Sequence, residues 1–258
     1  MTRETEEKLA GSLTAETTEL LPFLPYLLQD FWELGSNPEV MAELIKKHVS
    51  VSESTRILDL ACGKGAVAIK VAQKLRANVK GVDLMPAFIE YAAQKAKEYG
   101  VSDLCEFTVG DIKETVKKAK DYDCVIFGAV GKVLGTPAET LDQLKTVIKT
   151  GGYILMDECY LPDAGTQEEV RYRYCEYLTE KQWVDLFQAA GLDLVETVFS
   201  DDSGSDSGTA AITARANELI EKHPDKQAMF EGYIRSQQNE YDDIDNSLVA
   251  VTWILRKR

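Results

Sequence analysis

The sequence is poor in the residues that most often bind metals. It holds two histidines and five cysteines among 258 residues, and no two cysteines form a C-x-x-C pair. An odd number of scattered cysteines without metal-ligand spacing predicts reduced thiols, a cytoplasmic location and no metal site.

Positive charge and long apolar runs are also scarce. Lys and Arg number 29 against 43 Asp and Glu, which gives a formal net charge of −14. Nucleic-acid binding draws its affinity from a basic surface, so this composition argues against a nucleic-acid partner. No apolar run approaches the roughly 20 residues that span a bilayer. The polar, acidic N-terminus resembles neither a secretory signal nor a transit peptide, so we expect no membrane partner.

What the sequence does contain is an alternation of short apolar runs with amphipathic helices. Five such runs stand at residues 56–61, 79–84, 105–111, 122–130 and 153–161. Short strands separated by amphipathic helices are typical of a parallel sheet with helices on both faces. A sixth run at 193–200 and a closing run at 247–258 lack this rhythm, which favours an antiparallel last strand. The predicted fold is α/β, a doubly wound, seven-stranded and mostly parallel sheet.

Three segments outside this pattern are predicted to form a helical cap. They are the N-terminal residues 1–50 and two insertions, at about 160–178 and 200–246, into a core domain of residues 51–258. The second insertion opens with a Gly/Ser/Asp-rich stretch, residues 200–210, whose composition predicts a flexible linker. A cap of this size favours an enclosed small molecule over a protein or polynucleotide surface. Closure of the cap would exclude water from a reaction.

The clearest local signal is the stretch RILDLACGKGAVAIKVA at residues 56–72. Its Gly63, Gly65 and Ala68 satisfy the G-x-G-x-x-G/A spacing of dinucleotide-binding turns. Glycine lets the backbone approach a ligand closely, and the helix that follows points its amide N–H groups at that ligand. More than one nucleoside cofactor needs such an approach, so the glycines alone leave the cofactor open.

Acidic residues close three successive strands of the predicted sheet. Asp59 precedes the glycine turn, where it would repel the pyrophosphate of a nicotinamide dinucleotide but would suit a cationic ligand. Asp83 lies about 20 residues beyond the glycines, a spacing at which a carboxylate accepts ribose hydroxyls in either type of site. Asp111 ends the third strand. An acid at one strand end is most often a turn or cap residue, but three in succession with a glycine turn indicate a nucleoside site.

The order of these motifs resembles that of class I, Rossmann-like S-adenosylmethionine-dependent methyltransferases of the small-molecule type. The resemblance rests on ILDLACGKGAVAI and the acids after it, extends from about Arg56 to Gly191, and resumes in the closing strands. It implies a methyltransferase that moves a methyl group from S-adenosyl-L-methionine to an O, N or C nucleophile of a small molecule. The cofactor-binding residues that it implies are Asp59, Ala61, Gly63, Gly65, Asp83, Leu84, Asp111, Ile112 and Gly128.

The resemblance also implies roles for several of these residues. Asp59 would orient the methionyl ammonium, and Asp83 would accept the ribose hydroxyls. Leu84 would flank the adenine, and Asp111 would accept a hydrogen bond from the adenine amino group. Gly128 ends the fourth strand, where the family places backbone against the methionyl part and the methyl donor. No Asn-Pro-Pro-Tyr motif stands there, so the type that methylates amino groups of DNA bases is not indicated.

No single residue is identified as catalytic. Methyl transfer depends mainly on proximity and alignment, and it needs a general base only if the nucleophile arrives protonated. By their position near the end of the fifth strand, the weak candidates are Asp157, Glu158 and Tyr160. The candidates for substrate binding are Tyr160, Arg171, Arg173 and Tyr174. An arginine pair among tyrosines could hold a carboxylate or phosphate, and an amphipathic helix with its aromatic side packed is an equal alternative.

Two other functions stay open at this point. An NAD(P)-dependent oxidoreductase is supported by the glycine spacing and Asp83, but it predicts no role for Asp59 or Asp111. A non-catalytic protein that binds S-adenosylmethionine is also compatible with the sequence, because methyl transfer requires no particular catalytic side chain.

Overall fold

The computed structural model describes residues 2–163, 165–172, 176–200 and 205–258. The chain forms two compact units, which are described separately. The sheet unit comprises Trp32–Glu158, Lys181–Phe199 and Val251–Arg258, and the helical unit comprises Met1–Phe31, Cys159–Glu180 and Ser200–Ala250. That the helical unit acts as a cap stays a prediction.

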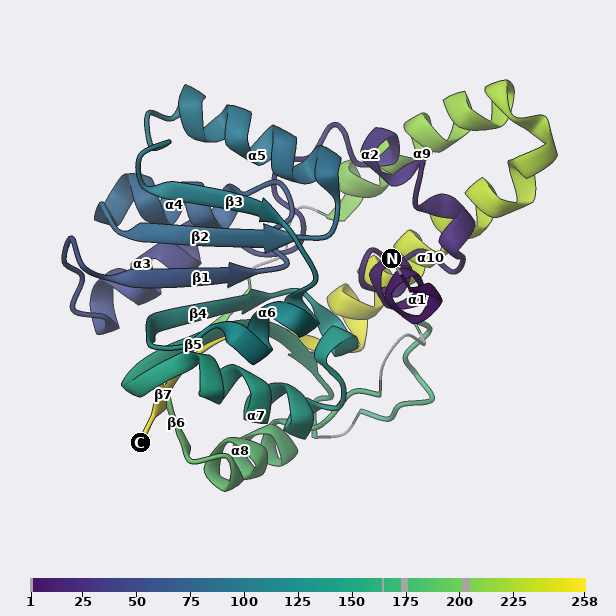
Figure 1. The fold of residues 1–258 in the computed structure, drawn as a ribbon. Helices are drawn as coiled ribbons and strands as arrows, with labels where there is room; N and C mark the ends of the chain where they lie inside the picture. The colour runs from purple at the N-terminus through teal and green to yellow at the C-terminus, as the bar shows by residue number, and fades with distance from the viewer. Residues whose placement is uncertain (1, 164, 173–175, 201–204) are drawn as a thin grey trace. The chain divides into compact units, whose positions relative to one another are not determined.

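A seven-stranded sheet in the order β3-β2-β1-β4-β5-β7-β6 organises the sheet unit (Figure 1). The strands are β1 Arg56–Leu60, β2 Asn78–Asp83, β3 Cys105–Val109, β4 Tyr122–Gly128, β5 Ile148–Tyr160, β6 Leu192–Phe199 and β7 Val249–Lys257. Strands β1 to β5 pair in parallel, and β7 pairs antiparallel with β6. The predicted fold class, including the antiparallel last strand, is confirmed.

Helices cover both faces of this sheet (Figure 1). One face carries α3 Pro38–His48, α4 Ala66–Leu75 and α5 Pro86–Glu98, and the other carries α6 Ile112–Lys118 and α7 Pro137–Val147, with η2 Gly131–Leu134 before α7. A core of fully buried aliphatic side chains joins α3, α4 and the central strands, among them Met41, Val71, Ile57 and Leu155. Burial of apolar surface on this scale is the main force that holds the layers together.

Most of the charged stretch at residues 113–121 lies in α6. It forms a helix because the Asp111 side chain caps it, accepting the Lys113 N–H at 2.8 Å. Ile112 and Val116, four residues apart, then bury their side chains on one face. A cap and two buried contacts suffice to fold a short charged segment.

Helix α8 Glu180–Ala189 packs against the last strand through aromatic rings. Trp183 and Phe187 of α8 lie with ring centroids 5.4 and 5.2 Å from that of Trp253 in β7. Large apolar rings packed edge to face or tilted contribute more than their buried area alone. This cluster anchors the β6–β7 end of the sheet.

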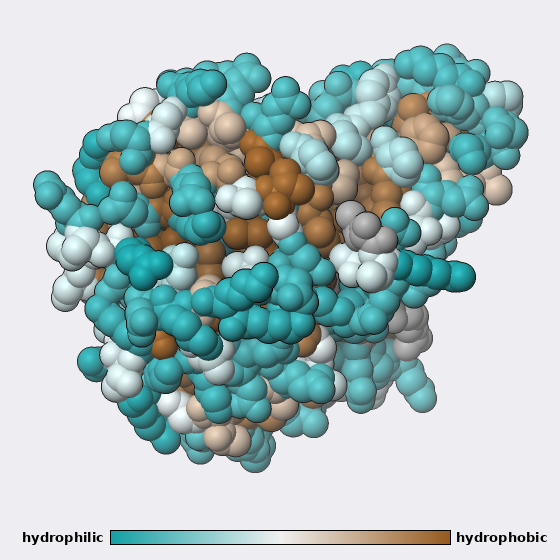
Figure 2. All heavy atoms as spheres, viewed as in Figure 1, coloured by the Kyte–Doolittle hydropathy of each residue, from teal (hydrophilic) through white to brown (hydrophobic). Residues whose placement is uncertain are grey.

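The helical unit contains α1 Arg3–Ser12, η1 Thr18–Leu20, α2 Leu24–Leu27, α9 Ser205–Lys222, η3 Pro224–Lys226 and α10 Gln227–Asn246. Ion pairs between Arg215 of α9 and Asp30, at 2.7 Å, and contacts of α9 with α10 hold it together. None of its helices, or of the others in the described ranges, is long and apolar enough to cross a membrane. The visible surface is largely hydrophilic (Figure 2), in keeping with the high content of charged residues.

The flexible linker predicted for residues 200–210 is wrong over its second half. Gly204 lies outside the described residues, but α9 already begins at Ser205. At Gly208 an added Cβ would lie 3.0 Å from the Tyr241 hydroxyl oxygen of α10. Close packing between the two helices therefore overrides a composition that is typical of loops.

Candidate functional site

The glycine turn between β1 and α4 has a backbone that most side chains would disfavour. Ala61, Gly63 and Gly65 have positive φ angles of 56°, 51° and 76°. A Cβ on Gly65 would lie 2.7 Å from the Ala92 Cβ and 2.9 Å from the Phe107 Cζ. Both the conformation and the close packing therefore require glycine at position 65. No described side chain caps α4 at this residue, so its first amide N–H groups can serve a ligand.

Aromatic residues outside the turn contact Lys64, which lies within it. The Lys64 side chain is buried, with its ammonium 5.1 Å from the Tyr91 ring centroid and 5.7 Å from that of Phe88. The Trp32 Nε1–H donates to the Lys64 carbonyl at 3.0 Å. Cation–π contacts and this hydrogen bond stabilise the conformation of the turn.

Asp83 joins the end of β2 to the same turn. Its Oδ2 accepts the Gly63 N–H at 2.9 Å, and its Oδ1 accepts the Met85 N–H at 2.8 Å. Burial raises the pKa of Asp83, and the backbone N–H groups of Met85, Gly63 and Leu84 oppose that rise. Each carboxylate oxygen keeps a second lone pair, so a donor from a ribose can still be accommodated.

Asp59 lies behind the turn at the end of β1. Only 4% of the residue is exposed, and its Oδ2 has no hydrogen-bond partner among the described residues. Burial raises the pKa of Asp59 to about 8, the charges of Asp83 and Asp157 add to that rise, and the Ala68 amide opposes it. An unsatisfied buried carboxylate oxygen is costly, and a cationic ligand would relieve that cost.

Asp111, which follows β3, lies close to the end of β2, where Asp83 stands. The Gly110 N–H donates to the Asp83 carbonyl at 2.8 Å, so the ends of β2 and β3 are adjacent. The next residue, Asp111, is half-buried and caps α6, and Ile112 after it is buried. Leu84 follows Asp83 and is half-buried. All of the implied nucleoside contacts thus stand at the carboxyl ends of neighbouring strands.

The weak catalytic candidates lie along β5. Asp157 pairs with Gly128 in the β4–β5 register, and its Oδ1 accepts the Thr252 hydroxyl at 2.5 Å. Its Oδ2 is buried and has no hydrogen-bond partner among the residues described. Glu158 is half-buried, and Tyr160 is buried with a pKa that burial raises. Alternation along the strand directs Asp157 and Glu158 to opposite faces of the sheet.

Residues 34–36 form a contact that the sequence did not reveal. The Leu34 Cδ1 lies 3.2 Å from the place of a Cβ on Gly63, and the Ala129 Cβ lies 2.6 Å from the place of one on Gly35. The Ser36 hydroxyl oxygen takes the space where a Cβ on Gly128 would lie. The segment therefore lies against both the glycine turn and the end of β4. It stood within the predicted cap segment 1–50, and no motif in it pointed to a site.

The substrate-binding candidates fall in the helical unit. The Arg171 guanidinium pairs with Asp242 at 2.7 Å, and the Arg171 N–H donates to the Asp243 Oδ2 at 2.8 Å. Arg173 and Tyr174 lie outside the described residues. Arg171 is thus already engaged with acids of α10.

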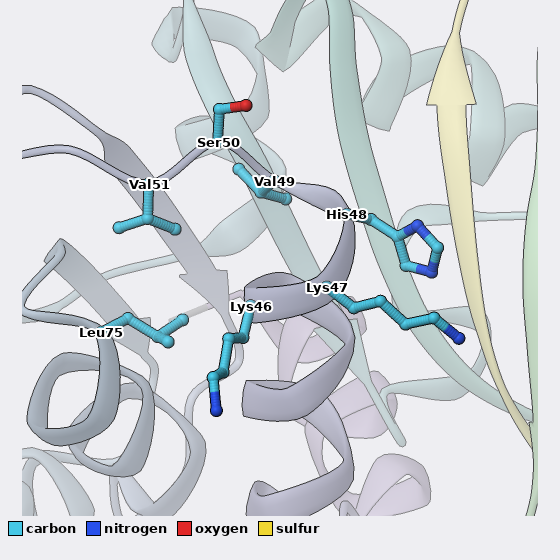
Figure 3. A pocket seen from close by; sticks show the side chains of 7 residues that line it. All are labelled: Lys46, Lys47, His48, Val49, Ser50, Val51 and Leu75. Atoms are coloured by element: carbon cyan, nitrogen blue, oxygen red, sulfur yellow. The ribbon is translucent and has the colours of Figure 1, made fainter.

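A separate pocket of about 390 Å³ is lined by Lys46, Lys47, His48, Val49, Ser50, Val51 and Leu75 (Figure 3). Figure 3 shows Lys47 and His48 directed away from Lys46 and Leu75. The His48 Nε2 lies 2.5 Å from the Glu196 Oε2. Most residues that line this pocket come just before β1 in the chain, so the pocket lies at the amino end of β1. The acids and glycines of the candidate site lie at the carboxyl ends of the strands. It is not part of the candidate site.

The glycine turn and the acids at the strand ends form one candidate site, and no group of residues within the described ranges could hold a metal. Residues 51–199 match the family model described as a methyltransferase domain, a span of more than half of the chain. The chain therefore belongs to the methyltransferase-domain family and is a methyltransferase. The family match sets aside the oxidoreductase alternative.

The chain is also similar to individual proteins in sequence or in fold. The chain is 30% identical over 193 residues to Escherichia coli YjhP, an uncharacterized protein, covering 72% of this chain and 75% of YjhP. It is 24% identical to the methyltransferase GfsG of Streptomyces halstedii, covering 70% of this chain and 68% of GfsG. The fold is similar to that of a Geobacter sulfurreducens S-adenosylmethionine-dependent methyltransferase in complex with S-adenosyl-L-homocysteine, with a TM-score of 0.76, 23% identity and coverage of 92% and 98%.

Proposed function

We propose that this methyltransferase transfers a methyl group from S-adenosyl-L-methionine to an O, N or C nucleophile of a small molecule. The observation that carries the proposal is Asp59, whose buried Oδ2 lies behind the glycine turn and has no hydrogen-bond partner in the described part of the chain. A dinucleotide pyrophosphate would be repelled at this point, whereas a methionyl ammonium would be bound.

The cofactor residues take their roles from their places at the strand ends. Asp59 binds the ammonium, and Gly63 and Gly65 let the backbone of the turn approach the cofactor closely. Asp83 accepts the ribose hydroxyls while holding the turn through the Gly63 N–H. The adenine lies near Asp111. Further cofactor contacts are assigned to Ala61, Leu84, Ile112 and Gly128.

Bound S-adenosylmethionine supplies an activated methyl group, which leaves the protein mainly the task of alignment. Asp59, Asp83 and the glycine turn would hold the donor while its methyl group passed from sulfur to the acceptor's lone pair. The chain contributes by holding donor and acceptor in line and by excluding water. A general base, if an acceptor requires one, would come from Asp157, Glu158 or Tyr160.

The small-molecule acceptor is supported by charge and by chain organisation. A net charge of −14 offers little attraction for a polyanion. The helical unit gives the chain a second compact body, beyond the nucleotide-binding sheet, for acceptor recognition. Tyr160 and Arg171 belong to it and are the described candidates for that recognition.

A methyl-acceptor screen with isotopically labelled S-adenosylmethionine tests the proposal. We expect label in one class of small molecule, and loss of that labelling in Asp59→Asn. Label that appears only in tRNA, DNA or protein would refute the small-molecule assignment. An Asp59→Asn variant that labels as fast as the unmodified protein would refute the assigned donor site.

A further inference from the structure

A second unsatisfied acid stands beside the predicted methyl-donor position. The Asp157 Oδ2 lies 3.2 Å from the place of a Cβ on Gly128, and it is buried without a hydrogen-bond partner among the described residues. The Ser36 hydroxyl oxygen occupies the place that this Cβ would take. The Asp157 Oδ2 therefore lies close to both Ser36 and the Gly128 backbone, at the end of β4.

The orientation of Asp157 is fixed from the opposite side. Thr252 of β7 donates its hydroxyl to Oδ1 at 2.5 Å, and Oδ2 has no hydrogen-bond partner in the described part of the chain. Ser36 lies over Gly128 and, with Thr252, opposes the rise that burial causes in the pKa of Asp157. A carboxylate held by one oxygen presents the other in a defined direction.

Asp59 and Asp157 affect each other electrostatically. The charge of Asp157 contributes to the raised pKa of Asp59. The two strands are separated only by β4, which pairs Asp59 with Ile126 and Asp157 with Gly128. Each of these acids has one buried oxygen without a hydrogen-bond partner among the described residues, and both acids are stabilised when positive charge is bound beside them.

This inference rests on the proposed function. The proposed donor carries two positive charges, an ammonium and a sulfonium, and they are expected to lie at different places in the site. The ammonium, assigned to Asp59, is present in both S-adenosylmethionine and S-adenosylhomocysteine. The sulfonium is present only in the donor, because transfer of the methyl group leaves a neutral thioether. An acid beside Gly128 can therefore distinguish the donor from the product by charge.

We propose that Asp157, oriented by Thr252 and flanked by Ser36, faces the sulfonium and makes the site prefer the charged donor over its neutral product. Asp157 is thus a positioning and specificity residue. It favours exchange of the spent product for fresh donor. A general base is not required of it.

Calorimetric titration with S-adenosylmethionine and S-adenosylhomocysteine tests this role without any acceptor. Asp157→Asn keeps an oxygen for the Thr252 hydroxyl but removes the charge. It should weaken donor binding about tenfold more than product binding, the size expected for loss of one close, partly screened charge pair. Asp59→Asn should weaken both ligands by similar factors, because both carry the ammonium.

Asp185→Asn is the matched control, because it makes the same substitution at an exposed residue of α8. It should leave the ratio of the two affinities unchanged. Equal losses for both ligands in Asp157→Asn, or no loss, would overturn the proposal while leaving the methyltransferase site intact. Failure of the unmodified protein to bind either ligand would instead contradict the proposed donor site. A thermal melt of each variant without ligand establishes that it is folded.

Discussion

The Asp83 carboxylate accepts the Gly63 backbone N–H at 2.9 Å, which ties the end of β2 to the glycine turn after β1. Its other oxygen accepts the Met85 N–H at 2.8 Å, at the start of α5. A single buried side chain thus fixes two backbone segments that are expected to surround the cofactor. Asp83 consequently has a structural role in addition to its proposed contact with the ribose.

Asp83→Ala should therefore destabilise the protein without any ligand. It leaves the Gly63 and Met85 N–H groups without acceptors, at a cost of about 2–4 kcal/mol in the free energy of unfolding. Asp111→Ala is the comparison, because it removes one helix cap at a cost of about 1 kcal/mol. Urea denaturation of both variants checks the order, and an equal or smaller loss in Asp83→Ala would contradict the bracing role.

Substitutions at Gly65 and Gly100 can distinguish the cost of backbone strain from the cost of steric clash. Both have positive φ, 76° and 67°. A Cβ on Gly100 would meet no described atom within 4 Å, whereas one on Gly65 would clash with Ala92 and Phe107. Gly100→Ala should cost about 1 kcal/mol through backbone strain alone. Gly65→Ala should cost about 2–4 kcal/mol because overpacking adds to it. Equal losses in thermal or urea melts would show that the turn tolerates a side chain.

The raised pKa of Asp59 predicts how the stability of the ligand-free protein depends on pH. Its pKa rises from an ordinary 3.8 in the unfolded chain to about 8 in the folded protein. At a pH between 3.8 and 8, Asp59 is therefore protonated in the folded protein and ionised in the unfolded chain. The contribution of Asp59 to stability is therefore greatest at low pH and falls as the pH rises toward 8. Asp59→Asn does not titrate, so it should gain stability relative to the unmodified protein by up to about 1.4 kcal/mol per pH unit.

Urea denaturation at pH 5 and pH 8 measures that gain, since other titrating groups are common to both proteins. A difference in stability that stays constant across this range would mean that Asp59 ionises normally in the folded state. The same substitution should weaken cofactor binding. Asp59 would therefore lower the stability of the ligand-free protein while raising its affinity for the cofactor.

Cys62 lies within the glycine turn but should be chemically inert. Its Sγ lies 2.8 Å from the place of a Cβ on Gly81, and burial raises the pKa of its thiol well above the ordinary value. Since the thiolate is the reactive form, we expect no labelling of Cys62 by a thiol reagent in the native protein and full labelling in urea. Peptide mass mapping checks this, and rapid native labelling of Cys62 would show that the turn is open.

The sheet could be predicted from the sequence because its signals are local. Apolar strands, amphipathic helices and acids at strand ends such as Asp59 and Asp83 repeat in chain order. Helix α6 could not be predicted from its charged composition, because its stability depends on the Asp111 cap and two buried side chains. The first turns of α9 likewise depend on packing against α10.

The missed part of the candidate site depends on contacts between distant residues. Ser36 contacts Gly128, although almost one hundred residues separate them in the sequence. No sequence pattern around Ser36 predicts that contact. Asp157 was placed correctly at the end of the fifth strand, but its free oxygen and its bond to Thr252 require the positions of β5 and β7. Pairing of this kind is set by tertiary structure.

Calorimetry with S-adenosylmethionine, S-adenosylhomocysteine and NAD tests the central claim most directly. We predict that both sulfur nucleosides bind at one site per chain, that NAD does not bind, and that Asp59→Asn weakens both nucleosides. Tight binding of NAD with no binding of either sulfur nucleoside would contradict the account.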